Sequence, residues 1–186
     1  YNYKLAGGEI NVRTENPDSI ITDLNNSTSI CSLTTNYNNF LMWAHYAEAH
    51  TGICLKFDFK DTKIRKSFHA LNMLIPQSTN KIFEDVYEVQ YTDIRPNIND
   101  ELLSLFIFKS KQWSYENEFR LINLTPKKPI TYQTECLISI YAGCRMHTEN
   151  VKTIENILKT QKHHTNLYKM VIDPHEFKLN PQLIDY

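Results

Sequence analysis

The sequence predicts an α+β fold, in which about three helices pack on a mixed, mainly antiparallel sheet or sheets. Two observations predict it. Short stretches with the two-residue period of strands and stretches of helical period follow one another in irregular order. Neither a repeat nor the glycine fingerprint of a βαβ nucleotide-binding unit occurs. A length of 186 residues, with 41% hydrophobic and 22% charged side chains, is enough for one well-packed core.

Strands are predicted where apolar side chains occur at every second position or form short runs. The clearest case is residues 53–59, where Ile and Leu, then Phe twice, alternate with Cys, Lys and Asp, the pattern of a half-buried strand. The other predicted strands are residues 29–33, 85–91, the surroundings of Phe119 and Leu121, 137–142, 167–172 and 177–179.

Three helices are predicted from capping residues and from the helical spacing of apolar side chains. The first covers residues 40–47, is capped by Asn38-Asn39 and is stopped by Gly52. The second opens at Pro96 and Asn99-Asp100 and carries Leu102, Leu103, Phe106 and Lys109. The third begins at Thr148, and its inward-facing residues are Val151, Ile154, Ile157 and Leu158.

For domain organisation, residues 1–28 are interpreted as an irregular N-terminal segment and residues 29–186 as a single α+β domain. The chain opens on Tyr1 without an initiator Met, so we expect it to be part of a longer polypeptide. Four cysteines without a C-x-x-C pair are expected to be buried free thiols, which indicates a cytoplasmic protein.

The balance of charged residues and the lengths of the apolar runs indicate which classes of partner are expected. Twenty Lys and Arg residues nearly match 21 Asp and Glu, which argues against nucleic acid as a general partner. No apolar run reaches the ~18 residues that span a bilayer, so no membrane partner is expected. The partners that remain are a small-molecule nucleotide, another protein, or the rest of a longer chain.

A first group of candidate functional residues lies in the stretch 43–52, with Trp43, His45 and Tyr46 at its start. His45 and His50 are five positions apart and so do not share a helix face as a zinc pair would, and no metal site is predicted. Two interpretations stay open. The helix faces the core through Trp43, or His45 or Tyr46 projects into a cleft beside the strand at 29–33.

A second group covers residues 109–122. If residues 116–122 are extended, Glu116, Glu118 and Arg120 point to one side of the strand while Phe119 and Leu121 are buried on the other. Such a face can hold one carboxylate ionised against a developing cation and use the other to orient a hydroxyl. The alternative is a solvated strand face whose ion pair contributes under ~1 kcal/mol. Lys109, placed one helical turn before Trp113, is expected nearby.

These motifs together resemble the bacterial domain of unknown function 2971 family, over about residues 29–180. The Trp-x-x-Tyr of residues 43–46 and the Trp-x-Tyr-Glu-x-Glu-x-Arg of residues 113–120 are the most specific elements, and Ile140-Tyr141-Ala142-Gly143 follows them. Glu116-x-Glu118 is also similar to the late strand of ADP-ribosyltransferases, which implies NAD as substrate.

That similarity implies roles for individual residues. Glu118 would stabilise an oxocarbenium-like ribosyl cation and hold the ribose 2′-hydroxyl, while Glu116 would orient the acceptor. By the same similarity, Arg120, His45 or Lys109 would contact phosphates, and Trp43, Tyr46 or Trp113 would stack on a ring.

The leading hypothesis is a glycosyl-transfer domain that acts on NAD or a related nucleotide, as a toxin or anti-phage defence effector, with NAD as substrate and no resident cofactor implied. One alternative is a metal-dependent nuclease with Mg²⁺ on Asp58 and Glu118. Arg120 then stands where such sites usually have a Lys, and it cannot readily lose a proton to act as a base. The other is a non-catalytic sensor module that binds a ligand or protein.

Overall fold

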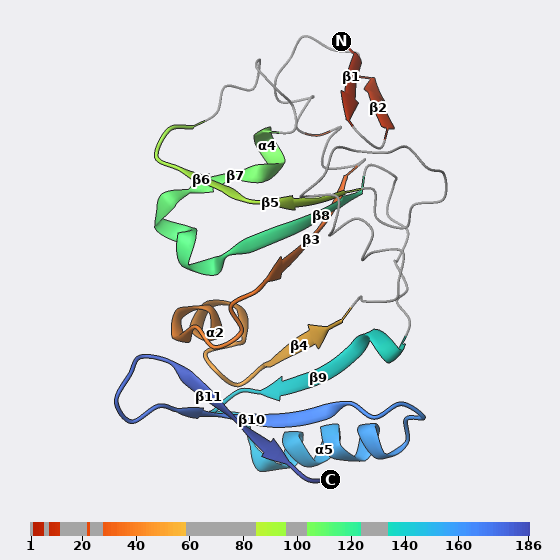
Figure 1. Ribbon diagram of the computed structural model, residues 1–186, viewed down its shortest axis with the longest axis vertical. Coiled ribbons are helices and arrows are strands. Elements are labelled where there is room, and N and C mark those ends of the chain that lie inside the picture. The colour runs from red at the N-terminus through yellow and green to blue at the C-terminus, as the bar shows by residue number, and fades with distance from the viewer. Residues whose placement is uncertain are drawn as a thin grey trace. The chain divides into compact units, whose positions relative to one another are not determined.

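The computed structural model describes residues 2–5, 8–11, 22, 28–58, 85–95, 104–123 and 134–186 (Figure 1). Its elements, in chain order, are β1 (Asn2–Leu5), β2 (Gly8–Asn11), β3 (Ser29–Thr34), α2 (Phe40–Tyr46), β4 (Ile53–Phe57), β5 (Asp85–Glu88), β6 (Gln90–Thr92), α4 (Ser104–Ile107), β7 (Phe108–Ser110), the 3₁₀ helix η1 (Lys111–Glu116), β8 (Glu118–Asn123), the 3₁₀ helix η2 (Thr134–Cys136), β9 (Leu137–Ala142), α5 (Thr148–Lys159), β10 (Asn166–Ile172) and β11 (Leu179–Ile184).

These elements confirm the predicted α+β class. Most strand pairs in the described part of the chain are antiparallel, and the β9–β10 and β6–β7 pairs are parallel. No helix among the described residues is long and apolar enough to cross a membrane.

The chain divides into two compact units, and the division into a segment 1–28 and a single domain 29–186 stays a prediction. The first unit comprises residues 1–35 and 60–130, and the second comprises residues 36–59 and 131–186. Within residues 1–28, interpreted as irregular, β1 and β2 form an antiparallel hairpin. Each unit is assembled from two separate stretches of the chain.

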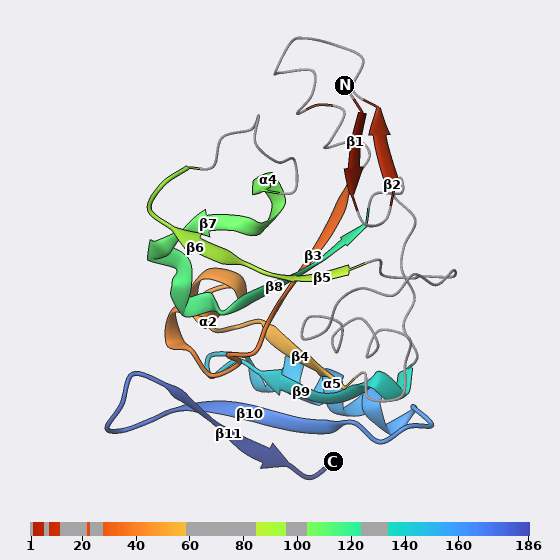
Figure 2. The same cartoon turned by 45° about the horizontal axis from the view of Figure 1, so that its top comes forward.

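The first unit is built around a three-stranded sheet in the order β3-β8-β5, so β8 is the central strand (Figure 2). Arg120 on β8 lies between Ser32 on β3 and Tyr87 on β5 in the pairing register. Leu121 and Ile122 are both buried, so β8 is covered on both faces. A second, two-stranded sheet pairs β6 with β7.

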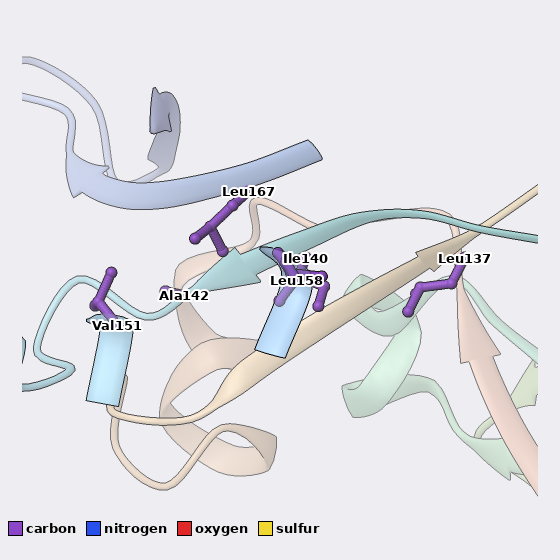
Figure 3. Packing of buried hydrophobic residues seen from close by; sticks show 6 residues of the cluster. All are labelled: Leu137, Ile140, Ala142, Val151, Leu158 and Leu167. Atoms are coloured by element: carbon purple, nitrogen blue, oxygen red, sulfur yellow. The ribbon is translucent and has the colours of Figure 1, made fainter. Parts of the chain in front are cut away.

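The second unit is a four-stranded sheet in the order β11-β10-β9-β4. The parallel strands β9 and β10 are joined through α5, as a parallel pair requires a crossover connection. Side chains of α5 and the sheet form one buried cluster (Figure 3), whose members are Leu137, Ile140, Ala142, Val151, Leu158 and Leu167. A second buried cluster joins α2 to β9, β10 and β11 through Trp43, Ala47, Tyr141, Met170 and Leu179.

The start of α2 agrees with the sequence. The Asn39 side chain accepts hydrogen bonds from the backbone N–H groups of Leu41 at 2.9 Å and Met42 at 3.2 Å, as a helix cap does. The helix ends at Tyr46, and residues 48–50 all have positive φ, so the helix stops before the predicted Gly52.

Other predicted elements differ from the structure, and the strand predicted at 177–179 begins only at Leu179, as β11. The strand predicted at 85–91 is interrupted at Val89 and becomes β5 and β6. Ile53 and Leu55 are exposed on β4, which is an edge strand of its sheet. Of the second helix, only α4 lies in the described part of the chain, and Lys109 belongs to β7 rather than to a helix. Residues 60–82 and the start of that helix lie outside the described residues.

Candidate functional site

Four charged side chains of the first unit form what we call the charged cluster: Lys109, Glu116, Glu118 and Arg120. The Lys109 ammonium contacts Oε2 of Glu116 and lies 3.1 Å from Oε2 of Glu118. Arg120 donates from Nε to Oε1 of Glu118 at 2.8 Å and from Nη2 to Oε2 at 3.1 Å. Two carboxylates thus share two cations, and the formal charge of the cluster is zero.

The central strand β8 fixes the core of this cluster. Glu118 is its first residue, and Glu118 and Arg120 lie on the same face because they are two positions apart. Glu116 is not on the strand, which corrects the expectation that residues 116–122 are all extended. It ends the 3₁₀ helix η1, and Asn117 turns the chain into β8 with φ 44° and ψ 54°. Asn tolerates this left-handed conformation better than most residues.

Both carboxylates are buried. Glu116 is 2% exposed and Glu118 is 6% exposed, so the alternative of a solvated strand face does not hold. Burying an ionised carboxylate is costly unless it is paired and hydrogen-bonded. Within the cluster, Lys109 and Arg120 supply that pairing, and removing either one leaves a buried charge with fewer partners.

Electrostatics keep Glu118 ionised. Burial alone would raise its pKa, but hydrogen bonds from Arg120, Ser32 and Lys109 outweigh burial and hold the pKa at about 2. Burial lowers the pKa of Lys109, but its bonds to Glu116 and Glu118 more than offset this and raise it. Glu118 therefore carries its charge at neutral pH and is a poor proton acceptor, while remaining able to stabilise a positive charge.

The hydrogen-bond capacity of Glu118 is filled. A carboxylate has about four acceptor positions. Two take hydrogen bonds from Arg120 and one takes a hydrogen bond from Lys109, and the Ser32 hydroxyl also donates to this side chain. A ligand atom that reaches Glu118 must therefore displace one of these donors.

Further groups hold the cluster in place, and the sequence did not identify them. The Tyr91 hydroxyl accepts a hydrogen bond from the backbone N–H of Glu118 at 2.9 Å, and Thr34 donates to the carbonyl of Glu116 at 2.5 Å. Arg120 also donates from Nη1 to the carbonyl of Phe106 at 2.6 Å. Tyr91 is paired in register with Lys109 between β6 and β7. Only the tertiary fold brings these partners together, so no local signal could have identified them.

Aromatic rings border the cluster, as the sequence suggested. The Lys109 ammonium lies 5.1 Å from the ring centroid of Trp113, within the range of a cation–π contact. The rings of Trp113 and Tyr115 have centroids 6.0 Å apart. The structure thus brings together five of the eight predicted site residues in one unit: Lys109, Trp113, Glu116, Glu118 and Arg120.

The other three predicted site residues belong to the second unit. Trp43 is 3% exposed and packs in the core, with its Nε1 donating to the carbonyl of Tyr37 at 2.7 Å. His45 and Tyr46 are exposed on α2, with ring centroids 6.3 Å apart. This arrangement agrees with the core-facing interpretation of the helix for Trp43 and gives no sign of a ring-stacking role for it.

The nuclease alternative stays a prediction. Asp58 belongs to the second unit and Glu118 to the first. Among the described residues, no three His, Cys, Asp or Glu side chains gather where they could hold a metal ion. Arg120 bonds Glu118 directly at the position where such sites usually have a Lys.

All four cysteines are free, as expected, but only Cys136 is buried, which corrects the expectation for the others. Cys31 is exposed, and Cys54 and Cys144 are partly buried.

The comparison with known families supports the resemblance found in the sequence. A family model described as "Protein of unknown function (DUF2971)" matches residues 42–121. The match covers less than half of the chain, and it includes the whole of both the Trp-x-x-Tyr and the Trp-x-Tyr-Glu-x-Glu-x-Arg elements. No curated protein and no solved structure matches the chain.

Proposed function

We propose that this chain carries a glycosyl-transfer domain that acts on NAD or a related nucleotide, with the charged cluster as its reaction centre. The observation that carries the proposal is the state of Glu118: a carboxylate on a central strand, 6% exposed, with a pKa of about 2. Such a group is negative at neutral pH and fixed in place, which suits the stabilisation of a positive charge rather than proton transfer.

The proposed reaction develops a positive charge on the ribosyl carbon, and Glu118 is the carboxylate that stabilises this charge. The bond between ribose C1′ and the nicotinamide nitrogen breaks, and its electron pair leaves with neutral nicotinamide. The ribosyl carbon becomes cationic and is stabilised by Glu118. Glu116 orients an acceptor nucleophile, whose lone pair forms the new bond to C1′ and whose proton passes to solvent.

Substrate binding also has to release Glu118 from some of its donors. A dinucleotide brings a diphosphate, and Lys109 and Arg120 are the cations of the cluster. If the diphosphate attracts one of them, an acceptor position on Glu118 becomes available to the ribose 2′-hydroxyl. Because strong depletion of NAD harms a cell, the proposal includes a role as a toxin or defence effector.

The test measures nicotinamide release from NAD by the purified chain, with Glu118→Gln as the test variant. Loss of the charge at this position is expected to lower the rate by about 10²-fold or more, the scale of removing one electrostatic stabiliser. Glu88→Gln is the matched control, because Glu88 is an exposed glutamate of the same sheet. Release that is unchanged by Glu118→Gln would contradict the proposal.

A non-catalytic binding module is the second candidate, and the saturation of Glu118 favours it. A carboxylate whose acceptor positions are filled by its own protein serves well as a scaffold for neighbouring groups. In that case NAD or another nucleotide raises the melting temperature, Glu116→Ala weakens the effect, and no nicotinamide appears. Product formation separates the two candidates.

A further inference from the structure

The ammonium group of Lys109 has an unusual set of neighbours. It contacts one carboxylate oxygen of Glu116, lies 3.1 Å from one of Glu118, and stands 5.1 Å from the ring centroid of Trp113. The Lys109 side chain is 21% exposed, whereas those of Glu116 and Glu118 are 3% and 7% exposed. Lys109 therefore reaches two buried anions from the more exposed side of the cluster.

The same surroundings suit any organic cation of similar size. Aromatic faces attract ammonium and pyridinium groups through the ring quadrupole, and buried carboxylates add a direct charge interaction. Lys109 makes these contacts with a flexible four-carbon stem, so its ammonium can leave without a change in the backbone.

Arg120 is held differently. Its guanidinium makes two hydrogen bonds to Glu118 and a third to the carbonyl of Phe106. It can therefore stay in place and keep Glu118 ionised when Lys109 departs. The described hydrogen bonds of the Lys109 side chain, by contrast, go to the carboxylates of Glu116 and Glu118 and not to a backbone group.

We infer that the Lys109 ammonium occupies the place that a positively charged group of the ligand takes, between Glu116 and Glu118 and beside the ring of Trp113. Resting on the proposed function, the group is the pyridinium of an oxidised nicotinamide nucleotide. Lys109 moves to the ligand's diphosphate as the pyridinium enters. Such a ligand carries a positive pyridinium and a negative diphosphate. The pyridinium replaces Lys109 beside Glu116 and Glu118 while the diphosphate pairs with Lys109, so no buried carboxylate is left unpaired.

The experiment uses two probes that differ in charge and share a ring: 1-methylnicotinamide, whose methylated ring nitrogen makes it a pyridinium cation, and neutral nicotinamide. Binding of each to the wild-type chain and to Lys109→Met is measured by calorimetry. The variant is expected to bind 1-methylnicotinamide about tenfold more tightly than the wild type does, with no gain for nicotinamide. Adding Trp113→Leu to Lys109→Met should remove part of that gain.

A second measurement covers the case in which Lys109→Met does not fold. In Lys109→Ala, methylammonium can enter the vacated position, so it should raise the melting temperature of this variant and not that of the wild type. Equal binding of the charged and neutral probes to Lys109→Met overturns the inference. If only Lys109→Ala can be studied, a melting temperature that methylammonium does not raise overturns the inference.

This inference and the proposed function can fail separately. Selective cation binding without nicotinamide release from NAD keeps the inference and refutes glycosyl transfer. Nicotinamide release that depends on Glu118, together with no preference for the charged probe, refutes the inference and keeps the enzyme.

Discussion

At the residue scale, the charged cluster is a balance between the cost of burial and the gain from pairing. Glu116 and Glu118 are almost fully inaccessible to water, and each is stable there because a cation touches it. Breaking one such contact costs more than the contact contributes net, because the remaining charge stays buried without its partner. The residue-scale predictions therefore concern what happens when one member of the cluster is removed or neutralised.

Arg120→Met should destabilise the first unit strongly. Glu118 loses two hydrogen bonds and keeps its charge in a buried position, so the free energy of unfolding should fall by about 3–5 kcal/mol. Urea denaturation measures it. The matched control is Lys111→Met, which breaks an exposed pair with Asp93 at 3.9 Å and should cost under ~1 kcal/mol. Similar losses for the two variants would contradict the buried-pair account.

The stability of the first unit should fall in acid. The pKa of Glu118 is about 2 in the folded protein, below its ordinary value of 4.5, so the folded state favours the ionised form. The resulting stabilisation is fully present above about pH 5 and is lost as the pH falls toward 2, by roughly 3 kcal/mol in total. Urea denaturation at a series of pH values measures this slope. Glu118→Gln should flatten it, and a slope that is unchanged in this variant would assign the effect to other carboxyls.

At the element scale, the segment after α2 is the most strained part of the described backbone. Glu48, Ala49 and His50 have φ values of 47°, 51° and 72°, in the left-handed region that L residues occupy at a cost of roughly 1–2 kcal/mol each. Backbone bonds hold the segment: the carbonyl of His50 accepts from Arg145 at 3.0 Å, and Gly52 donates to Ala47 at 2.8 Å. The fold thus maintains a turn that its residues disfavour locally.

Ala49→Gly should therefore stabilise the second unit. Glycine adopts positive φ without a Cβ penalty, and the gain should be about 0.5–1 kcal/mol after the entropy lost by glycine. Ala44→Gly is the matched control, because Ala44 lies inside α2 and the same change there should cost about 0.5–1 kcal/mol. Thermal denaturation followed by circular dichroism compares the two, and opposite signs are expected. A loss of stability in both Ala49→Gly and Ala44→Gly would show that the turn is not strained at Ala49.

Elements with a strong local pattern could be predicted from the sequence, and those fixed by tertiary contacts could not. The strand 137–142 agrees with β9, and the cap at Asn39 is in place. The 3₁₀ turn that carries Glu116 could not be predicted, since Glu116 to Ile122 has the alternation of a strand. The partnership of Tyr91 with Glu118 joins residues 27 positions apart and leaves no mark in either local sequence.

At the scale of the whole molecule, the chain passes between the two units three times, near residues 35, 59 and 130. Neither unit can therefore be excised as one continuous fragment. Each contains one of the two tryptophans of the sequence: Trp113 in the first and Trp43 in the second. Fluorescence of Trp113→Phe and Trp43→Phe variants can thus follow the two units separately.

Gly143→Ala tests whether the units unfold separately. A Cβ at Gly143 would lie 2.1 Å from the carbonyl oxygen of His50, and both are backbone positions of the second unit that cannot easily move apart. The expected loss is about 3 kcal/mol or more. Gly52→Ala is the matched control, since its Cβ would approach the backbone of Ala47 only to 3.1 Å and should cost less.

Because each unit has its own buried side chains, Gly143→Ala should shift the unfolding midpoint reported by Trp43 far more than that reported by Trp113. Acid should instead shift the midpoint reported by Trp113 more than that reported by Trp43, since Glu118 and its partners lie in the first unit. Urea denaturation of the two single-tryptophan variants, each with and without Gly143→Ala, measures both midpoints. Equal shifts at the two tryptophans would mean that the units fold as one cooperative body, and a variant in either unit would then also affect the charged cluster.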